Sequence, residues 1–134
     1  ATKAFQDLAA KGGEEGAIAK FYLGSMALES GKTADAEKLL KEAADGAGKQ
    51  YGSVAKLALG QLYYGTGKKA EGEKLIRELI NSPTVLVSKE QATIALAEVI
   101  AKDNPAEARK LLEPLRTDRS ALSRAALSLL GSIS

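Results

Sequence analysis

The chain has 134 residues, enough for one domain, and its apolar residues are mostly alanine and leucine, with only two Phe and four Tyr as aromatics. It contains no cysteine and no histidine, which excludes disulfides, thiolate nucleophiles, imidazole bases and the usual zinc ligands. The net charge of +2, with both signs interspersed, provides no extended field for a nucleic acid. We therefore expect an all-α domain that has no catalytic site, no metal and no cofactor.

The hydrophobic periodicity predicts eight helices in chain order, at residues 1–11, 14–30, 33–45, 51–66, 68–81, 88–102, 105–116 and 118–132. Short polar breaks separate them. Thr33 is placed to cap the third helix and Asn104 the seventh, while Ser88 with Gln91 predicts a capping box before the sixth. None of the helices is long and apolar enough to suggest insertion into a membrane.

The helices repeat with a period of 36 residues. The stretch LGSMALESGKTADAEKLL at 23–40 returns as LGQLYYGTGKKAEGEKLI at 59–76, and a third copy continues with Leu111 in the place of Leu75. Each full copy contains a first and a second helix, and the copies span residues 14–49, 50–85 and 86–117. A lone second helix at 1–11 precedes them, and a lone first or capping helix at 118–134 follows. The pattern predicts a stack of helix pairs within one domain, 1–134.

Small residues recur where neighbouring helices must approach closely. They are Gly24, Gly60 and Gly131 in first helices, Ala36, Gly72 and Ala108 in second helices, and Gly31 and Gly67 in the turns. In the third copy, Leu96 stands where the other first helices have glycine. Large side chains at these places would force the paired helices apart.

The register extends into both ends of the chain. At the beginning, the spacing of Ala36, Leu40 and Ala43 is shared by Ala1, Phe5 and Leu8. The last helix carries one apolar stripe, formed by Leu122, Ala126, Leu129 and Leu130. This stripe can cap the stack, and any apolar surface left over predicts a homodimer through the terminal helices.

These residues resemble the tetratricopeptide repeat, a helix-turn-helix unit of about 34 residues. The spacing departs from it, and Lys20, Lys56 and Ala92 replace the large aromatic expected early in the first helix. The resemblance implies a right-handed α-solenoid whose first helices line a concave groove. The Ala- and Leu-rich copies are also similar to bacterial domains that follow a membrane anchor and attend the Sec translocon or envelope assembly. That likeness implies a periplasmic location, and a cytoplasmic one stays open.

The resemblance places a candidate binding groove on the first helices. Its expected exposed positions are Phe21, Ser25, Leu28, Leu57, Gln61, Tyr64, Thr93, Ala97 and Ile100. Leu28, Tyr64 and Ile100 are equivalent and would form an apolar stripe suited to an amphipathic helix or an extended hydrophobic segment. Core packing is the alternative for Leu28 and Ile100, whereas Tyr64 is the better candidate for a partner contact.

We therefore predict a non-catalytic scaffold that binds a protein or peptide segment in this groove, in envelope protein assembly or translocation. The alternative is a structural module that mediates self-assembly or spaces other domains. An enzyme and a nucleic-acid-binding module are disfavoured because the chain offers neither a base, a thiol and a phosphate loop nor a basic surface.

Overall fold

The computed structural model describes residues 2–116 and 121–133. Within them the chain forms eight α-helices and no strand. The helices are α1 (Thr2–Lys11), α2 (Gly13–Glu29), α3 (Thr33–Gly46), α4 (Gly48–Gly65), α5 (Lys69–Asn81), α6 (Lys89–Ile100), α7 (Pro105–Leu112) with the 3-10 turn η1 (Glu113–Leu115), and α8 (Ala121–Ile133). The all-α prediction is confirmed, and the predicted helix starts at residues 1 and 118 lie outside the described residues.

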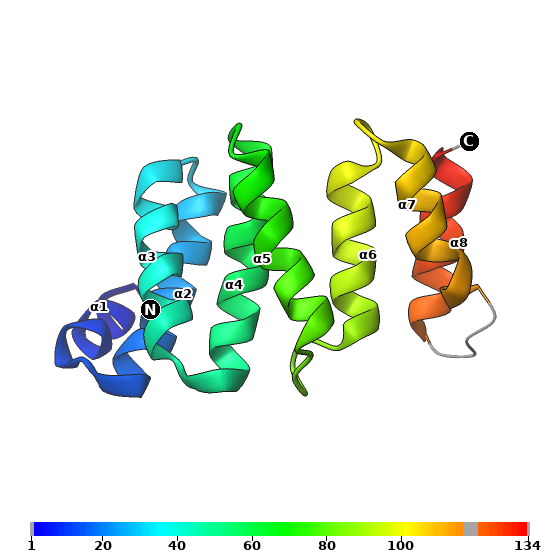
Figure 1. Ribbon diagram of the computed structural model, residues 1–134. Helices are drawn as coiled ribbons and strands as arrows, with labels where there is room; N and C mark the ends of the chain where they lie inside the picture. The colour runs from blue at the N-terminus through cyan, green and yellow to red at the C-terminus, as the bar shows by residue number, and fades with distance from the viewer. Residues whose placement is uncertain (1, 117–120, 134) are drawn as a thin grey trace.

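The helices follow one another in an open row (Figure 1). Each helix packs against the next one in the chain, and α2 also contacts α4, α4 contacts α6, and α6 contacts α8. We call α2, α4, α6 and α8 the first helices, and α1, α3, α5 and α7 the second helices. The first helices therefore form one continuous layer, and the molecule is an α-helical repeat.

The first and second helices of a pair approach closely at glycine. A Cβ built at Gly24 would lie 3.0 Å from Cγ of Leu40, and one built at Gly60 would lie 2.9 Å from Cγ1 of Ile76. Both partner side chains are fully buried. Because the two contacts are 36 residues apart at each end, segments one period apart occupy equivalent places in the stack.

A second pair of glycine contacts corrects the register of α1. A Cβ at Gly16 would lie 3.1 Å from the carbonyl oxygen of Leu8, and one at Gly52 would lie 3.0 Å from that of Ala44. Leu8 is therefore equivalent to Ala44 and not to Ala43. The expected match of Phe5 with Leu40 is wrong by the same residue, because the period of 36 continues unchanged into α1.

Two turns between paired helices use glycine as predicted. Gly31 and Gly67 have φ angles of 76° and 94°, in the left-handed region. The amide of the following residue reaches back five residues, from Lys32 to the Ala27 oxygen (2.8 Å) and from Lys68 to the Tyr63 oxygen (2.9 Å). These bonds satisfy carbonyls at the ends of α2 and α4.

The predicted helix caps have different outcomes. Ser88 and Gln91 form the expected capping box at α6, and the Asn104 side chain accepts a hydrogen bond from the Glu107 amide at α7. The cap expected from Thr33 is wrong, because α3 already begins there and Lys32, without a side-chain bond, takes the cap position. The glycine turn positions Lys32 in its place.

The third copy is shifted by one residue in its first helix. Ala55 of α4 and Ala92 of α6 are both fully buried. Four residues later in each helix, Leu59 and Leu96 are also buried. Each pair is 37 residues apart, not 36. The position of Gly60 is consequently taken by Ala97, and the expectation that Leu96 stands there is wrong.

The register changes at the connections before and after α6. A seven-residue connection, 82–88, joins α5 to α6, whereas Ala47 alone lies between α3 and α4. After α6, the Asn104 amide bonds to the Ile100 oxygen, four residues back, where the second copy spans five. The span between equivalent residues is thus one residue shorter, which restores the period of 36 in α7, and this turn contains no glycine.

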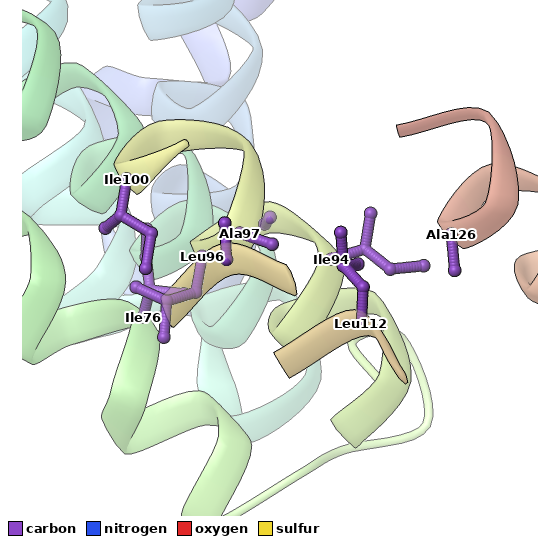
Figure 2. Close-up of a cluster of buried hydrophobic side chains, with 9 residues drawn as sticks. Ile76, Ile94, Leu96, Ala97, Ile100, Leu112 and Ala126 are labelled. Carbon is purple, nitrogen blue, oxygen red and sulfur yellow. The ribbon is translucent and has the colours of Figure 1, made fainter. Parts of the chain in front are cut away.

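The core consists of three clusters of buried side chains along the stack. Its C-terminal part brings together Ile76 of α5, Leu96 and Ile100 of α6, Leu112 of α7 and Ala126 of α8 (Figure 2). Leu129 and Leu130 of the predicted capping stripe are half-buried against this cluster, and the side chain of Leu122 lies outside the described residues. No helix in the described part of the chain could span a membrane.

Candidate functional site

Three of the nine expected groove positions lie inside the protein. Thr93, Ala97 and Ile100 are buried in α6, so they do not line an open surface. The reason is the one-residue shift of the third first helix: Ala97 occupies the close-packing position of Gly60 rather than the groove position of Gln61. A position counted at 36 residues therefore points into the core.

The corrected register identifies one line of equivalent polar positions across three first helices, two of them exposed. Glu98 takes the place equivalent to Gln61 and Ser25, and the side chains of both Glu98 and Gln61 are exposed. Ser25 is half-buried and its hydroxyl donates to the Phe21 carbonyl at 3.1 Å. We call Ser25, Gln61 and Glu98 the open line. Its polar side chains differ from the apolar stripe expected from the sequence.

One turn earlier on each first helix lie Tyr22, Ala58 and Ala95. Tyr22 is 40% exposed, and its ring stacks on Phe5 of α1 with centroids 5.3 Å apart. Ala58 is half-buried and Ala95 is buried, so the surface beside the open line is low. Tyr22 is therefore the exposed aromatic residue beside the open line.

Sequence reasoning missed both Glu98 and Tyr22 in this surface. The signal for Glu98 was present, since ATIALAEVI at 92–100 aligns with AKLALGQLY at 55–63 and places Glu98 on Gln61. Tyr22 shares a helix face with Ser25, three residues later. The period of 36 found elsewhere in the chain obscured the better local alignment.

The apolar groove candidates pack between repeats. Phe21 and Leu28 are half-buried against the cluster around Leu40 and Leu59, and Leu57 is half-buried against clusters that include Ile76. Leu28 and Ile100, for which core packing was the stated alternative, both lie in the core clusters. Their surfaces contribute to the stack itself.

Tyr64 is engaged within the protein. Its hydroxyl donates to Oδ2 of Asp103 at 2.7 Å, and Nζ of Lys69 donates to the same oxygen at 2.7 Å. The lysine also lies 5.6 Å from the centre of the Tyr64 ring. This cluster links the end of α4 to the break before α7, so it connects the second repeat with the third.

The electrostatics of this cluster follow from its contacts. Burial, and then the bond to Asp103, raise the pKa of Tyr64 to about 12. Lys69, and then Tyr64, lower the pKa of Asp103 by bonding to its charged form. The Tyr64 hydroxyl is thereby held as a protonated donor, and a partner could receive a hydrogen bond from it only by displacing Asp103.

A second kind of surface lies between successive second helices. Three depressions of about 560, 280 and 520 Å³ are bordered by equivalent residues, 36 apart. The equivalent sets are Asp35, Lys38 and Leu39; Glu71, Lys74 and Leu75; and Glu107, Lys110 and Leu111. Acid and lysine alternate at each rim, which leaves these depressions without a net charge to select a ligand.

The connection 82–88 is bonded to α4 but has one exposed apolar residue, Val85. The Thr84 hydroxyl lies 2.7 Å from that of Ser53 and accepts from the Val87 amide at 3.0 Å. Val87 is buried, whereas Val85 is 86% exposed. The ordered backbone thus holds one valine in the core and presents the other to solvent.

The described residues include no cluster of three acidic side chains able to hold a metal ion. Comparison of the chain with protein-family models, with curated proteins and with solved structures gave no match.

Proposed function

We propose that this chain is a tetratricopeptide-like scaffold that binds a partner segment across α2, α4 and α6 without catalysing a reaction. The observation that carries the proposal is the open line, in which Ser25, Gln61 and Glu98 occupy equivalent places on three successive first helices. The side chains of Gln61 and Glu98 are exposed to solvent. A regular row of such positions can meet a segment that runs across the repeats.

The receptor surface is ordered before binding. The first helices pack on one another and on their second helices, so little conformational entropy is lost in the scaffold when a partner binds. Gln61 and Glu98 offer hydrogen-bond acceptors, and the exposed Tyr22 offers an aromatic anchor. These groups fit a segment with basic or amide side chains and one apolar anchor.

The resemblance to membrane-anchored envelope domains suggests where to look for the partner. Under this proposal, the segment belongs to a protein that is assembled or translocated at the periplasmic face of the inner membrane. A partner segment, and not a nucleic acid, fits the mixed charges of the surface.

Site-specific crosslinking tests the proposal. A photoreactive phenylalanine analogue is placed at Gln61 or Glu98, and as a matched control at Lys74, which is exposed on a second helix. After irradiation in cells, we expect the same discrete adduct from the first two positions and none from the control. Equal adducts from all three, or adducts from Lys74 alone, would contradict binding on the open line.

The identified partner then allows a quantitative test. Replacing both Gln61 and Glu98 by Arg should weaken binding of the purified partner by about tenfold or more, because two acceptors become positive charges. Lys74→Glu, a charge change on the other side, should leave the affinity unchanged. Circular dichroism checks that each variant keeps its helical content.

A further inference from the structure

Two adjacent lysines join the second repeat to both of its neighbours. Nζ of Lys68 lies 2.7 Å from Oε1 of Glu37, on α3 of the first repeat. Nζ of Lys69 lies 2.7 Å from Oδ2 of Asp103, in the turn before α7 of the third repeat. The start of α5 is therefore bonded to the repeat on each side of it. We call these two ion pairs the clasp.

A tyrosine lies under each lysine of the clasp. Nζ of Lys68 is 5.1 Å from the centre of the Tyr63 ring, and Nζ of Lys69 is 5.6 Å from that of the Tyr64 ring. Tyr63 belongs to the core cluster that the first two repeats share, and Tyr64 packs against the cluster that the second and third share. Each ring is thus held by the interface that its lysine bridges.

The other two copies have no such pair of lysines. Lys32 and Thr33 stand at the matching turn of the first copy, and Asn104 and Pro105 at that of the third. Neither turn offers two adjacent cations that could bond to a repeat on each side. The central repeat therefore carries the residues that hold both neighbours.

The clasp lies at the opposite end of the row from the chain connections between repeats. In Figure 1 the turns within each pair of helices lie at the top, and the connections between pairs, Ala47 and 82–88, lie at the bottom. The chain itself joins the repeats at the bottom, whereas side chains join them at the top. A further ion pair, Arg77 with Glu107 at 3.8 Å, also joins α5 to α7. A hinge at one end and a clasp at the other is the arrangement that results.

We infer that the clasp sets the angle between successive repeats and opens when its charges are screened or removed. Its four side chains are between 33% and 56% exposed, so dissolved salt reaches them and weakens their attraction. Salt does not weaken the apolar core in the same way, so the core clusters keep the repeats together while the clasp end separates.

This inference goes beyond partner binding, because it concerns the scaffold alone. It has a consequence for the open line as well. The clasp residues Tyr64 and Asp103 follow Gln61 and Glu98 on the chain, at the ends of α4 and α6. Opening the clasp would therefore change the separation of these two open-line positions.

Pairs of nitroxide labels can measure the opening, since the chain contains no cysteine of its own. Ala34, Ala70 and Ala106 are exposed, 36 residues apart and close to the starts of α3, α5 and α7, so cysteines there place labels at the clasp end. Asp45 and Asn81, also exposed and 36 apart, place a control pair at the connection end. Double electron–electron resonance gives the distance distribution of each pair.

Salt is the first variable. Between about 10 mM and about 1 M sodium chloride, the Debye length falls from about 30 Å to about 3 Å. We expect the 34–70 and 70–106 distances to become longer and more broadly distributed, while the 45–81 distance stays the same. Equal changes at the two ends, or no change at either, would overturn the inference.

Removing one lysine at a time sharpens the test. At low salt, Lys68→Gln should lengthen the 34–70 distance alone. Lys69→Gln should lengthen the 70–106 distance alone, by a smaller amount because the pair between Arg77 and Glu107 remains. Lys20→Gln is the matched control, since Lys20 bonds to α3 within its own repeat, and it should change neither distance. Variants that leave their own interface unchanged, or that loosen both interfaces equally, would contradict the clasp.

Circular dichroism at both salt concentrations checks that the helices stay formed. A loss of helical signal over this range would mean unfolding instead of hinge opening, and would overturn the inference. The label distances require no partner, whereas crosslinking at Gln61 does. The failure of one experiment is therefore distinguishable from the failure of the other.

Discussion

The second and third repeats have different residues at the contact between their paired helices. In the second, Gly60 and Gly72 allow the paired helices to come so close that a Cβ at Gly72 would lie 2.7 Å from the Tyr64 amide nitrogen. In the third, Ala97 and Ala108 stand at the equivalent places and are fully buried. The pairing of helices is therefore kept with glycine at both contact positions in one repeat and with buried alanine at both in the other.

The difference extends to the connections. In the second repeat the turn between the paired helices contains a left-handed glycine, Gly67. In the third repeat Asp103 lies in that turn, and the hydrogen bond across it spans four residues instead of five. Instead of a glycine with a left-handed backbone, this turn has Asp103, which forms an ion pair with Lys69. In the third repeat, side-chain contacts of Asp103 hold this turn against the second repeat. In the second repeat, the backbone of Gly67 forms the turn.

The largest effect is expected from Gly72→Ala. Helix propensity favours alanine by about 1 kcal/mol, but its Cβ meets backbone atoms of α4 that cannot move aside separately. We expect a net loss of about 1–2 kcal/mol in the free energy of unfolding, measured by urea denaturation. A gain in stability would show that the two helices are not held at the observed distance.

The converse change is Ala108→Gly in the third repeat. It removes a fully buried methyl group and adds the entropic cost of glycine, so a loss of about 1–2 kcal/mol is expected. Together the two variants test whether each residue suits its own helix spacing. Free exchange of glycine and alanine at both positions would contradict the comparison.

A comparable effect is expected in the connection that precedes the third repeat's first helix. Val87→Ala should lower the free energy of unfolding by about 1–2 kcal/mol, because Val87 packs against Leu79 and Ala92. Val85→Ala is its matched control, and a change within about 0.5 kcal/mol is expected at this exposed position. Equal losses would mean that Val87 is not packed in the core as observed.

The smallest effect concerns Tyr64 and pH. Its folded-state pKa of about 12 lies above the ordinary value of 10.0, so the folded protein holds this proton more tightly than the unfolded chain does. The resulting stabilisation is fully present below pH 10.0 and is lost as the pH rises toward about 12.

Asp103→Asn tests the origin of this shift. Removing the carboxylate should lower the pKa of Tyr64, yet leave it above 10.0 because burial is the first cause. Absorbance of the phenolate, followed against pH as a difference from wild type, reports the change. An unaltered titration would show that Tyr64 is not bonded to Asp103 in solution.

The fold was predictable because its signals are local and repeated. Helical periodicity gave the eight helices, and glycine at 24, 60, 31 and 67 gave the close contacts and the turns. The capping box at Ser88 was readable for the same reason. Thr33 failed as a cap because the preceding glycine turn, and not the cap residue, sets where α3 begins.

The candidate site was less predictable because one residue of register decides which side of a helix is exposed. Counting at a constant 36 placed Ala97 on the surface and left Glu98 out, whereas α6 follows the connection 82–88 with its register shifted by one residue. The bond from Tyr64 to Asp103 joins residues 39 apart, and no sequence pattern marks it. Surface positions therefore required the observed packing.

The central claim is that pairs of helices one period apart are interchangeable units of an open stack. Duplication of residues 33–68 in place tests it, since Lys32 and Lys68 both precede a second helix. We predict a folded, monomeric protein whose helical content rises with the added segment and whose small-angle X-ray scattering shows a longer particle. A chain that aggregates or unfolds, or one that stays as compact as the original, would contradict the claim.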